Sequence, residues 1–240
     1  MYIFGAVAWD AVATVKTTSW TLIEGAAEGN AADREAFARR YEPVVRAYLS
    51  ARWRDAASRQ EIDDAIQETF VDCFRRGGAL ERAEREREGG FRAFLYGVVR
   101  NVALRAEEVR AFRSRKLGAP ELDADAIASL DASLSRVFDR AWAVSLLREA
   151  AALHGERAGA GGEGARQRFE LLRLRFEDDL PIREIARRRG VDPAELHHEY
   201  AKAREEFRAA LADVVAFHHP GTKGEVDRRC ESLLAHVSVD

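Results

Sequence analysis

The sequence predicts an all-α fold, with two helical domains joined by a flexible linker. Hydrophobic residues recur every three or four positions over most of the chain, strand-like alternation is nearly absent, and only five prolines interrupt the 240 residues. Hydrophobic residues make up 47% of the chain, enough to build ordinary buried cores. We therefore expect a globular helical protein.

The overall charge is close to neutral. The chain has 38 basic and 41 acidic residues, for a net charge of −3, so any contact with nucleic acid must rest on local patches. Cys73 and Cys230 form neither a disulfide framework nor a metal cluster, which suits the reducing cytoplasm. The opening MYIFGAVAWD fits neither a signal peptide nor a membrane span, and a start codon assigned too early explains it equally well.

Two helices are expected in the first part of the chain. Asn30 is predicted to cap the first, whose apolar stripe is Phe37, Tyr41, Val44, Val45 and Leu49. The second contains the stretch DDAIQETFVDCF, residues 63–74, and buries Ile62, Ile66, Phe70 and Cys73. Its opposite face carries Asp64, Gln67, Glu68 and Val71. A valine among outward-facing polar residues suggests a contact surface, although a solvated face with one stray valine is the alternative.

A third helix is predicted from Phe91 onward, after an exposed connector that contains the run ALERAEREREGG. Its apolar stripe is Phe91, Phe94, Leu95, Val98, Val102 and Val109. On another face Arg92, Tyr96 and Arg100 lie four apart, an aromatic ring between two cations, which suits single-stranded DNA. Further basic residues follow as Arg105, Arg110, Arg113, Arg115 and Lys116. The alternative is that the last of these complement the helix dipole.

After the linker LGAPELDADA, helices resume near Ser129, and GERAGAGGEGA is predicted to be a flexible break. No Lys-Ser or Lys-Thr follows these glycines, so they do not form a phosphate loop. A helix ending at Phe176 is followed by a short helix, then Gly190, then a helix that Asp192 caps with Pro193 at its first position. This is a helix-turn-helix pattern.

The second helix of this pattern is expected to be long and amphipathic. Its predicted buried stripe is Leu196, Tyr200, Ala203, Phe207 and Leu211. The segment FHHPGT then interrupts the chain, and one last amphipathic helix is predicted from Val226, Cys230, Leu233 and Val237.

These segments, in this order, resemble the bacterial RNA polymerase sigma factors of the extracytoplasmic-function (ECF) type. The resemblance rests on FARRYEPVVRAYL, DDAIQETFVDCF and FRAFLYGVVRNVA, and then on LPIREIARRRGV and AKAREEFRAAL. It implies promoter recognition for core polymerase, with opening of the −10 element and recognition of the −35 element. The implied organisation is an N-terminal extension (1–29), a region-two domain (30–116), a linker (117–136), a region-four helix-turn-helix domain (137–215) and a C-terminal extension (216–240).

The resemblance also implies partners. Asp64, Gln67, Glu68 and Val71 would bind the clamp coiled coil of the largest subunit of core RNA polymerase, with Val71 as the dry centre of the contact. Promoter DNA is the second partner, and an anti-sigma factor is a third candidate. We expect no cofactor and no membrane contact. We also expect no enzymatic activity, since the sequence has no nucleophile-base pair, metal set or phosphate loop at a usable spacing.

The expected DNA-binding residues lie in both domains. In the first they are Arg92, Tyr96, Arg100, Asn101, Arg105, Arg110 and Arg113. In the second they are Arg183, Arg187, Arg188, His197, His198 and Lys202. Asn101 matches the family's Arg-Asn pair, and either touches DNA or secures the bundle.

The recognition helix departs from the family pattern. Glu195, His197, His198 and Glu199 occupy exposed early positions where relatives usually have basic or hydroxyl residues. Carboxylates are repelled by phosphates, although Glu can accept a hydrogen bond from cytosine. Our hypothesis is that His197, His198 and Lys202 contact bases or phosphates while the arginines set the register. The two pairs of adjacent histidines, at 197–198 and 218–219, lack the spacing of a metal site.

Two other functions remain open from the sequence. One is a helix-turn-helix DNA-binding regulator that acts without core polymerase. The other is a sigma-derived protein-interaction module that no longer recognises the −35 element.

Overall fold

The computed structural model describes residues 19–54, 57–84, 89–115, 124–219 and 221–238. In these ranges the chain forms nine α-helices and one short 3-10 helix, and no strand. The predicted all-α class is therefore confirmed. The chain divides into two compact units: the first is Thr17–Trp142, and the second contains Ala143–Asp240. Among the described helices, none combines the length and the hydropathy needed to cross a bilayer.

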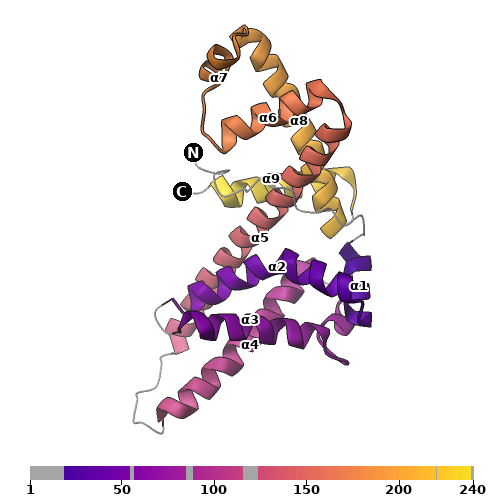
Figure 1. Cartoon of the computed structure of the whole chain (residues 1–240). Coiled ribbons are helices and arrows are strands. Elements are labelled where there is room, and N and C mark those ends of the chain that lie inside the picture. The colour runs from indigo at the N-terminus through magenta and orange to yellow at the C-terminus, as the bar shows by residue number, and fades with distance from the viewer. Residues whose placement is uncertain (1–18, 55–56, 85–88, 116–123, 220, 239–240) are drawn as a thin grey trace. The chain divides into compact units, whose positions relative to one another are not determined.

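The first unit is a bundle of helices (Figure 1). Its elements are α1 (Ser19–Glu28), α2 (Ala31–Arg52), α3 (Arg59–Phe74), η1 (Leu80–Arg82), α4 (Gly90–Arg115) and the first part of α5 (Ala124–Ala160). Helix α2 packs against α1, α3 and α4. Phe37 lies at the centre of its aromatic core, with ring centroids 5.4 Å from Phe74 and 5.8 Å from Phe91. Such edge-to-face contacts stabilise a core beyond the area they bury.

The helix starts in this unit depend on side-chain caps. Asn30 Oδ1 accepts hydrogen bonds from the backbone N–H groups of Ala32 (3.0 Å) and Asp33 (3.1 Å), which confirms the predicted N-cap of α2. Helix α3 begins with a capping box between Ser58 and Glu61, whose side chains each accept a hydrogen bond from the other's backbone N–H.

Helix α1 was not anticipated, because residues 1–29 were expected to lie outside the first domain. Trp20, Leu22 and Ile23 are buried, and the Trp20 ring meets Phe91 edge-on at 6.2 Å. Helix α1 therefore contributes to the core of the first unit.

Two members of the predicted α4 stripe are wrong. Val98 is only half-buried, and its neighbour Val99 is buried in its place. Phe91, Leu95 and Val102 are buried as expected, but 51% of the Val109 surface is exposed. Near Val109 the helix passes the polar first turn of α3, where Arg110 pairs with Glu61. Val109 lines a hollow there together with Trp53 and Ala65, and no side chain of the described residues fills it.

The second unit is built around α8. Its elements are the second part of α5, α6 (Glu163–Phe176), α7 (Ile182–Arg189), α8 (Pro193–His218) and α9 (Lys223–Ser238). Helix α8 packs against α6, α7 and α9. The predicted stripe is confirmed at Leu196, Ala203, Phe207 and Leu211, which are buried, and the predicted last helix is α9.

The glycine-rich break is shorter than predicted. Helix α5 continues through Gly155 and Gly159 to Ala160, and α6 begins at Glu163. A glycine inside a helix costs about 1 kcal/mol relative to alanine. The helix nevertheless continues through both glycines, and Ala158 between them is buried. Helix α5 also begins inside the predicted linker (117–136), at Ala124, whereas 117–123 lie outside the described residues.

Helices α7 and α8 meet at the predicted turn. Gly190 ends α7 with φ 65° and ψ 31°, the left-handed conformation that favours glycine. Asp192 then caps α8 by accepting a hydrogen bond from Ala194 N at 3.1 Å, with Pro193 at the first helical position. Both features confirm the sequence prediction. A small core holds the two helices on α6, and consists of Leu171, Ile182, Ile185, Ala186 and Leu196.

Candidate functional site

The outer face of α3 carries the four residues expected to bind polymerase. Ala65, Ile66 and Thr69 turn towards the core and are buried. The residues on the opposite face are all exposed, and they are Asp64, Gln67, Glu68 and Val71. Val71 is among the most exposed large hydrophobic residues described, at 56%. The structure thus brings the four side chains together on one open surface, called the α3 face below.

A shallow hollow of about 520 Å³ lies beside Val71. It is lined by Arg34, Gln67, Phe70, Val71, Phe74 and Arg75. The Arg34 guanidinium donates a hydrogen bond to the backbone carbonyl of Phe74 (2.7 Å) and lies 5.4 Å from the centroid of its ring. Arg34 is thereby held at the rim. An apolar centre with charged residues around it is the usual composition of a protein-protein contact.

Asp72 links α3 to the basic helix α4. This buried carboxylate pairs with Arg105 of α4, and lies 3.4 Å from Arg75. Arg105 also lies 3.9 Å from Glu68 of the α3 face. The sequence pattern predicts that Arg105 contacts DNA, and it does not single out Asp72 as its partner. Helical spacing could have shown that Asp72 is buried, because Asp72 follows the buried Thr69 by three positions and so lies on the same, inner side of α3.

A second ionic cluster holds the C-terminal half of α4 against the end of α2. Glu107 accepts hydrogen bonds from Arg52 at 2.6 and 2.9 Å, and from the Trp53 indole at 2.7 Å. Burial alone would raise the pKa of Glu107, but these hydrogen bonds hold it below its ordinary value. Arg110 lies 5.0 Å from the Trp53 ring centroid and 3.3 Å from Glu61. Arg110, expected to contact DNA, therefore has structural partners as well.

The surface expected to bind single-stranded DNA is not open in this structure. Arg92 forms an ion pair with Asp139 of α5. Tyr96 is half-buried, and its ring centroid lies 5.6 Å from that of Tyr48 and 5.3 Å from that of Phe138. The predicted aromatic ring between two cations thus lies under the first part of α5, a contact that sequence spacing does not reveal.

The other predicted residues of α4 have different surroundings. Asn101 is exposed and Arg100 is half-buried. The side chain of Arg113 lies outside the described residues. Asn101 is therefore open to a partner molecule in the structure as it stands.

The arginines at the end of α7 are partly neutralised by their own helix. Arg187 and Arg188 both donate hydrogen bonds to Glu184, at 2.8 to 2.9 Å. These bonds lower the pKa of Glu184 to about 2, so the carboxylate stays charged under all ordinary conditions. Both guanidinium groups remain well exposed. Arg183 is also exposed.

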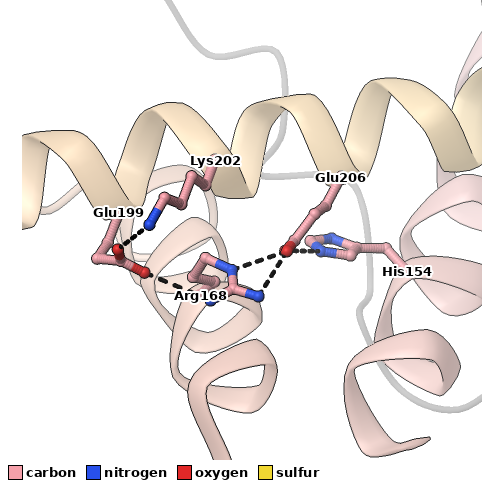
Figure 2. A network of polar contacts seen from close by, with 5 residues as sticks. All are labelled: His154, Arg168, Glu199, Lys202 and Glu206. Atoms are coloured by element: carbon pink, nitrogen blue, oxygen red, sulfur yellow. Dashed lines mark hydrogen bonds and ion pairs between the residues drawn. The ribbon is translucent and has the colours of Figure 1, made fainter. Parts of the chain in front are cut away.

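Lys202, the last of the cations expected to contact DNA, lies on α8 in a polar network (Figure 2). Lys202 Nζ lies 2.8 Å from Glu199, and Arg168 of α6 lies between Glu199 (3.4 Å) and Glu206 (2.7 Å). Glu206 also contacts the buried His154 of α5 at 3.4 Å. Arg168, Glu206 and His154 come from three different helices, so their spacing in the sequence does not predict that they meet.

The start of α8 has a mixed surface. Glu195, His197 and His198 are exposed, as the sequence predicts. With Lys202 and Arg187 engaged by carboxylates, this surface does not show the excess of positive charge that is typical of DNA-binding helices. In the described part of the chain, no three His, Cys, Asp or Glu side chains are grouped as metal ligands.

The comparison with family models returns one match within the first unit. Residues 37–116, about a third of the chain, match the model described as Sigma-70 region 2. This range contains α3 and α4 with the residues described above. The match supports a role in binding RNA polymerase and in promoter melting. No curated protein and no solved structure matches the chain.

Proposed function

We propose that this protein is an RNA polymerase sigma factor of the ECF type, which directs core polymerase to specific promoters in the cytoplasm. The observation that carries the proposal is the coincidence of the Sigma-70 region 2 match with the α3 face. On that face Val71 offers an exposed apolar centre, and Asp64 and Glu68 offer negative charge. These features suit the basic and apolar side chains of a coiled coil in the polymerase clamp.

In this proposal α4 contacts the −10 element. The DNA-binding residues of the first unit are Arg92, Tyr96, Arg100, Asn101, Arg105, Arg110 and Arg113. The guanidinium groups hold phosphates, and Tyr96 stacks on a base once the strands separate. Asn101 is already exposed. Arg105 and Arg110 have dual roles, since each also pairs with a carboxylate of α3.

Helices α7 and α8 form the proposed region-four helix-turn-helix, which contacts the −35 element. The turn at Gly190 and the cap at Asp192 support this assignment. In this proposal Arg183, Arg187 and Arg188 contact phosphates and set the register, whereas His197, His198 and Lys202 contact bases or phosphates. An anti-sigma factor completes the proposed set of partners.

A protein-interaction module remains the second candidate, and one observation favours it. Glu199 engages Lys202, and Glu184 engages two arginines, so the α7–α8 surface is nearly balanced in charge. Weak phosphate attraction would leave the second unit free to bind a protein.

Transcript mapping tests the proposal. Purified protein is mixed with core bacterial RNA polymerase and fragmented genomic DNA, and transcript 5′ ends are mapped beside a Gln67→Ala/Val71→Asp variant. We expect discrete starts with shared upstream elements, which are lost in the variant. For polymerase binding the matched control is Val191→Asp, since Val191 is an exposed valine (40%) in the second unit and lies outside the α3 face.

The control should keep polymerase binding in a pull-down assay, and thermal unfolding should show that all variants are folded. Absence of polymerase binding by the unmodified protein would overturn the sigma assignment. Polymerase binding without promoter-dependent starts would favour the protein-interaction module.

A further inference from the structure

The first part of α5 packs on the first unit along one apolar stripe. Leu134, Phe138 and Trp142 follow each other at helical spacing, and only 2%, 0% and 3% of their surfaces are exposed. The Trp142 ring stacks on Tyr41 of α2, with centroids 5.6 Å apart and planes at 8°. Residues 134–142, called the cover segment below, are therefore held by a specific set of buried rings.

The cover segment also contacts two residues that the proposed function assigns to melted DNA. Asp139 forms an ion pair with Arg92, whose guanidinium lies 5.9 Å from the centroid of the Phe138 ring. Tyr96 meets Phe138 with ring planes at 76° and centroids 5.3 Å apart. Only 27% of the Arg92 side chain and 23% of the Asp139 side chain are exposed. A cation and a ring of the proposed DNA surface are thus both occupied by the same chain.

The chemistry of this contact imitates the chemistry of a nucleotide. The Asp139 carboxylate gives the Arg92 guanidinium the charged hydrogen-bond acceptor that a phosphate would supply. Phe138 supplies the flat apolar ring that a base would bring to Tyr96. Two ligands that use the same donor and the same ring exclude each other.

On the premise of the proposed function, we infer that residues 134–142 are an intrachain substitute for single-stranded DNA. They cover Arg92 and Tyr96 in the free protein, and they leave this surface before a melted strand binds there. The free chain is therefore inhibited in single-strand binding, and DNA and the cover segment compete for one site.

The first test weakens the ionic half of the contact. The probe is a fluorescein-labelled single-stranded DNA of mixed sequence, and its affinity for the full chain is measured by fluorescence anisotropy. Asp139→Asn keeps the shape of the side chain and removes its charge. We expect it to bind the probe roughly tenfold more tightly than the unmodified chain does, because Arg92 is released for phosphate.

Two further variants make the result specific. Arg92→Ala added to Asp139→Asn should remove the gain, since the released cation is then missing. Glu108→Gln is the matched control, because Glu108 is an exposed acid on α4 outside the contact and its replacement changes the net charge equally. We expect this control to change the affinity by less than about twofold.

Hydrogen exchange of the unmodified chain gives an independent measurement. Backbone amides of residues 134–142 should be protected in the free protein and lose protection when saturating single-stranded DNA is added. This readout does not depend on any variant folding correctly. Unchanged or increased protection of the segment with DNA bound would overturn the inference.

Failure of the inference can be distinguished from failure of the proposed function. If Asp139→Asn and the unmodified chain bind the single-stranded probe equally well, residues 134–142 do not compete with DNA and the inference is wrong. Discrete promoter-dependent starts in the transcript mapping would still support the sigma assignment. Conversely, a gain in Asp139→Asn that Arg92→Ala reverses would support the cover even if the protein does not bind polymerase.

Discussion

Glu107 and Arg52, which lie 55 positions apart in the sequence, form a two-point ion pair between α4 and α2. The Arg52 side chain is 2% exposed, and the Glu107 side chain 33%. The indole of Trp53 donates a third hydrogen bond to the same carboxylate. This cluster holds the C-terminal half of α4 in place within the first unit.

Removal of the Glu107 carboxylate should destabilise the first unit. Glu107→Ala removes the carboxylate to which the buried Arg52 guanidinium donates two hydrogen bonds, and we expect the free energy of unfolding to fall by about 2–3 kcal/mol. Urea unfolding followed by circular dichroism measures this change. Glu108→Ala, at an exposed neighbouring position, should change it by less than about 0.5 kcal/mol. Similar effects of the two substitutions would contradict a structural role for the ion pair.

The stability of the second unit should decrease at mildly acidic pH because of His154. Burial between neighbouring helices lowers the pKa of His154, and the nearby Glu206 only partly offsets this. The unfolded chain therefore takes up a proton at a higher pH than the folded chain. Stability is complete above the ordinary histidine pKa of about 6.5, and falls as the pH decreases through that value towards the lower pKa of the folded state.

Thermal unfolding between about pH 7.5 and pH 5.5 checks this prediction. Arg157 and Arg168 also face His154, and both disfavour its protonation. In a His154→Gln variant the loss of stability over this range should be smaller than in the unmodified chain. His197→Gln, at an exposed position, should retain the full pH dependence. If the stability of His154→Gln decreased with pH as steeply as that of the unmodified chain, other titratable groups would be responsible for the pH dependence.

Glu199 should limit the binding of duplex DNA by the second unit. It engages both Lys202 and Arg168, so Glu199→Gln frees positive charge on the proposed recognition helix. We expect duplex affinity to rise roughly threefold to tenfold, with a salt dependence steeper by about one phosphate contact. Glu205→Gln, at an exposed position on α8, is the control for net charge. Equal gains in both variants would show a general charge effect.

Replacement by alanine should lower the stability of the second unit at Gly190 and raise it at Gly159. An added methyl group would have no neighbour within 4 Å at either site, so contacts do not distinguish them. Gly190 has φ 65°, where alanine is strained, and Gly190→Ala should cost about 1 kcal/mol of stability. Gly159 lies inside α5, and Gly159→Ala should stabilise the second unit by about 0.5 kcal/mol. Denaturant unfolding of both variants measures these changes.

The features that could be predicted from the sequence depend on residues close together along the chain. Helical spacing predicts the α3 face, and Gln67 and Val71, four positions apart, are both exposed there. The caps at Asn30 and Asp192 and the turn at Gly190 also have local causes. In each case the residue's own backbone, or a neighbour within four positions, decides the conformation.

Only the tertiary structure decided which side chains meet across helices. Arg92 and Tyr96 occupy the helix face that spacing predicts, yet Asp139 and Phe138 of α5 cover them. Val109 continues an apolar pattern but remains exposed. Periodicity specifies a face of one helix, whereas burial and ion pairing depend on which other helix packs there. That choice is made by the combined packing of distant segments, so no short stretch of sequence contains it.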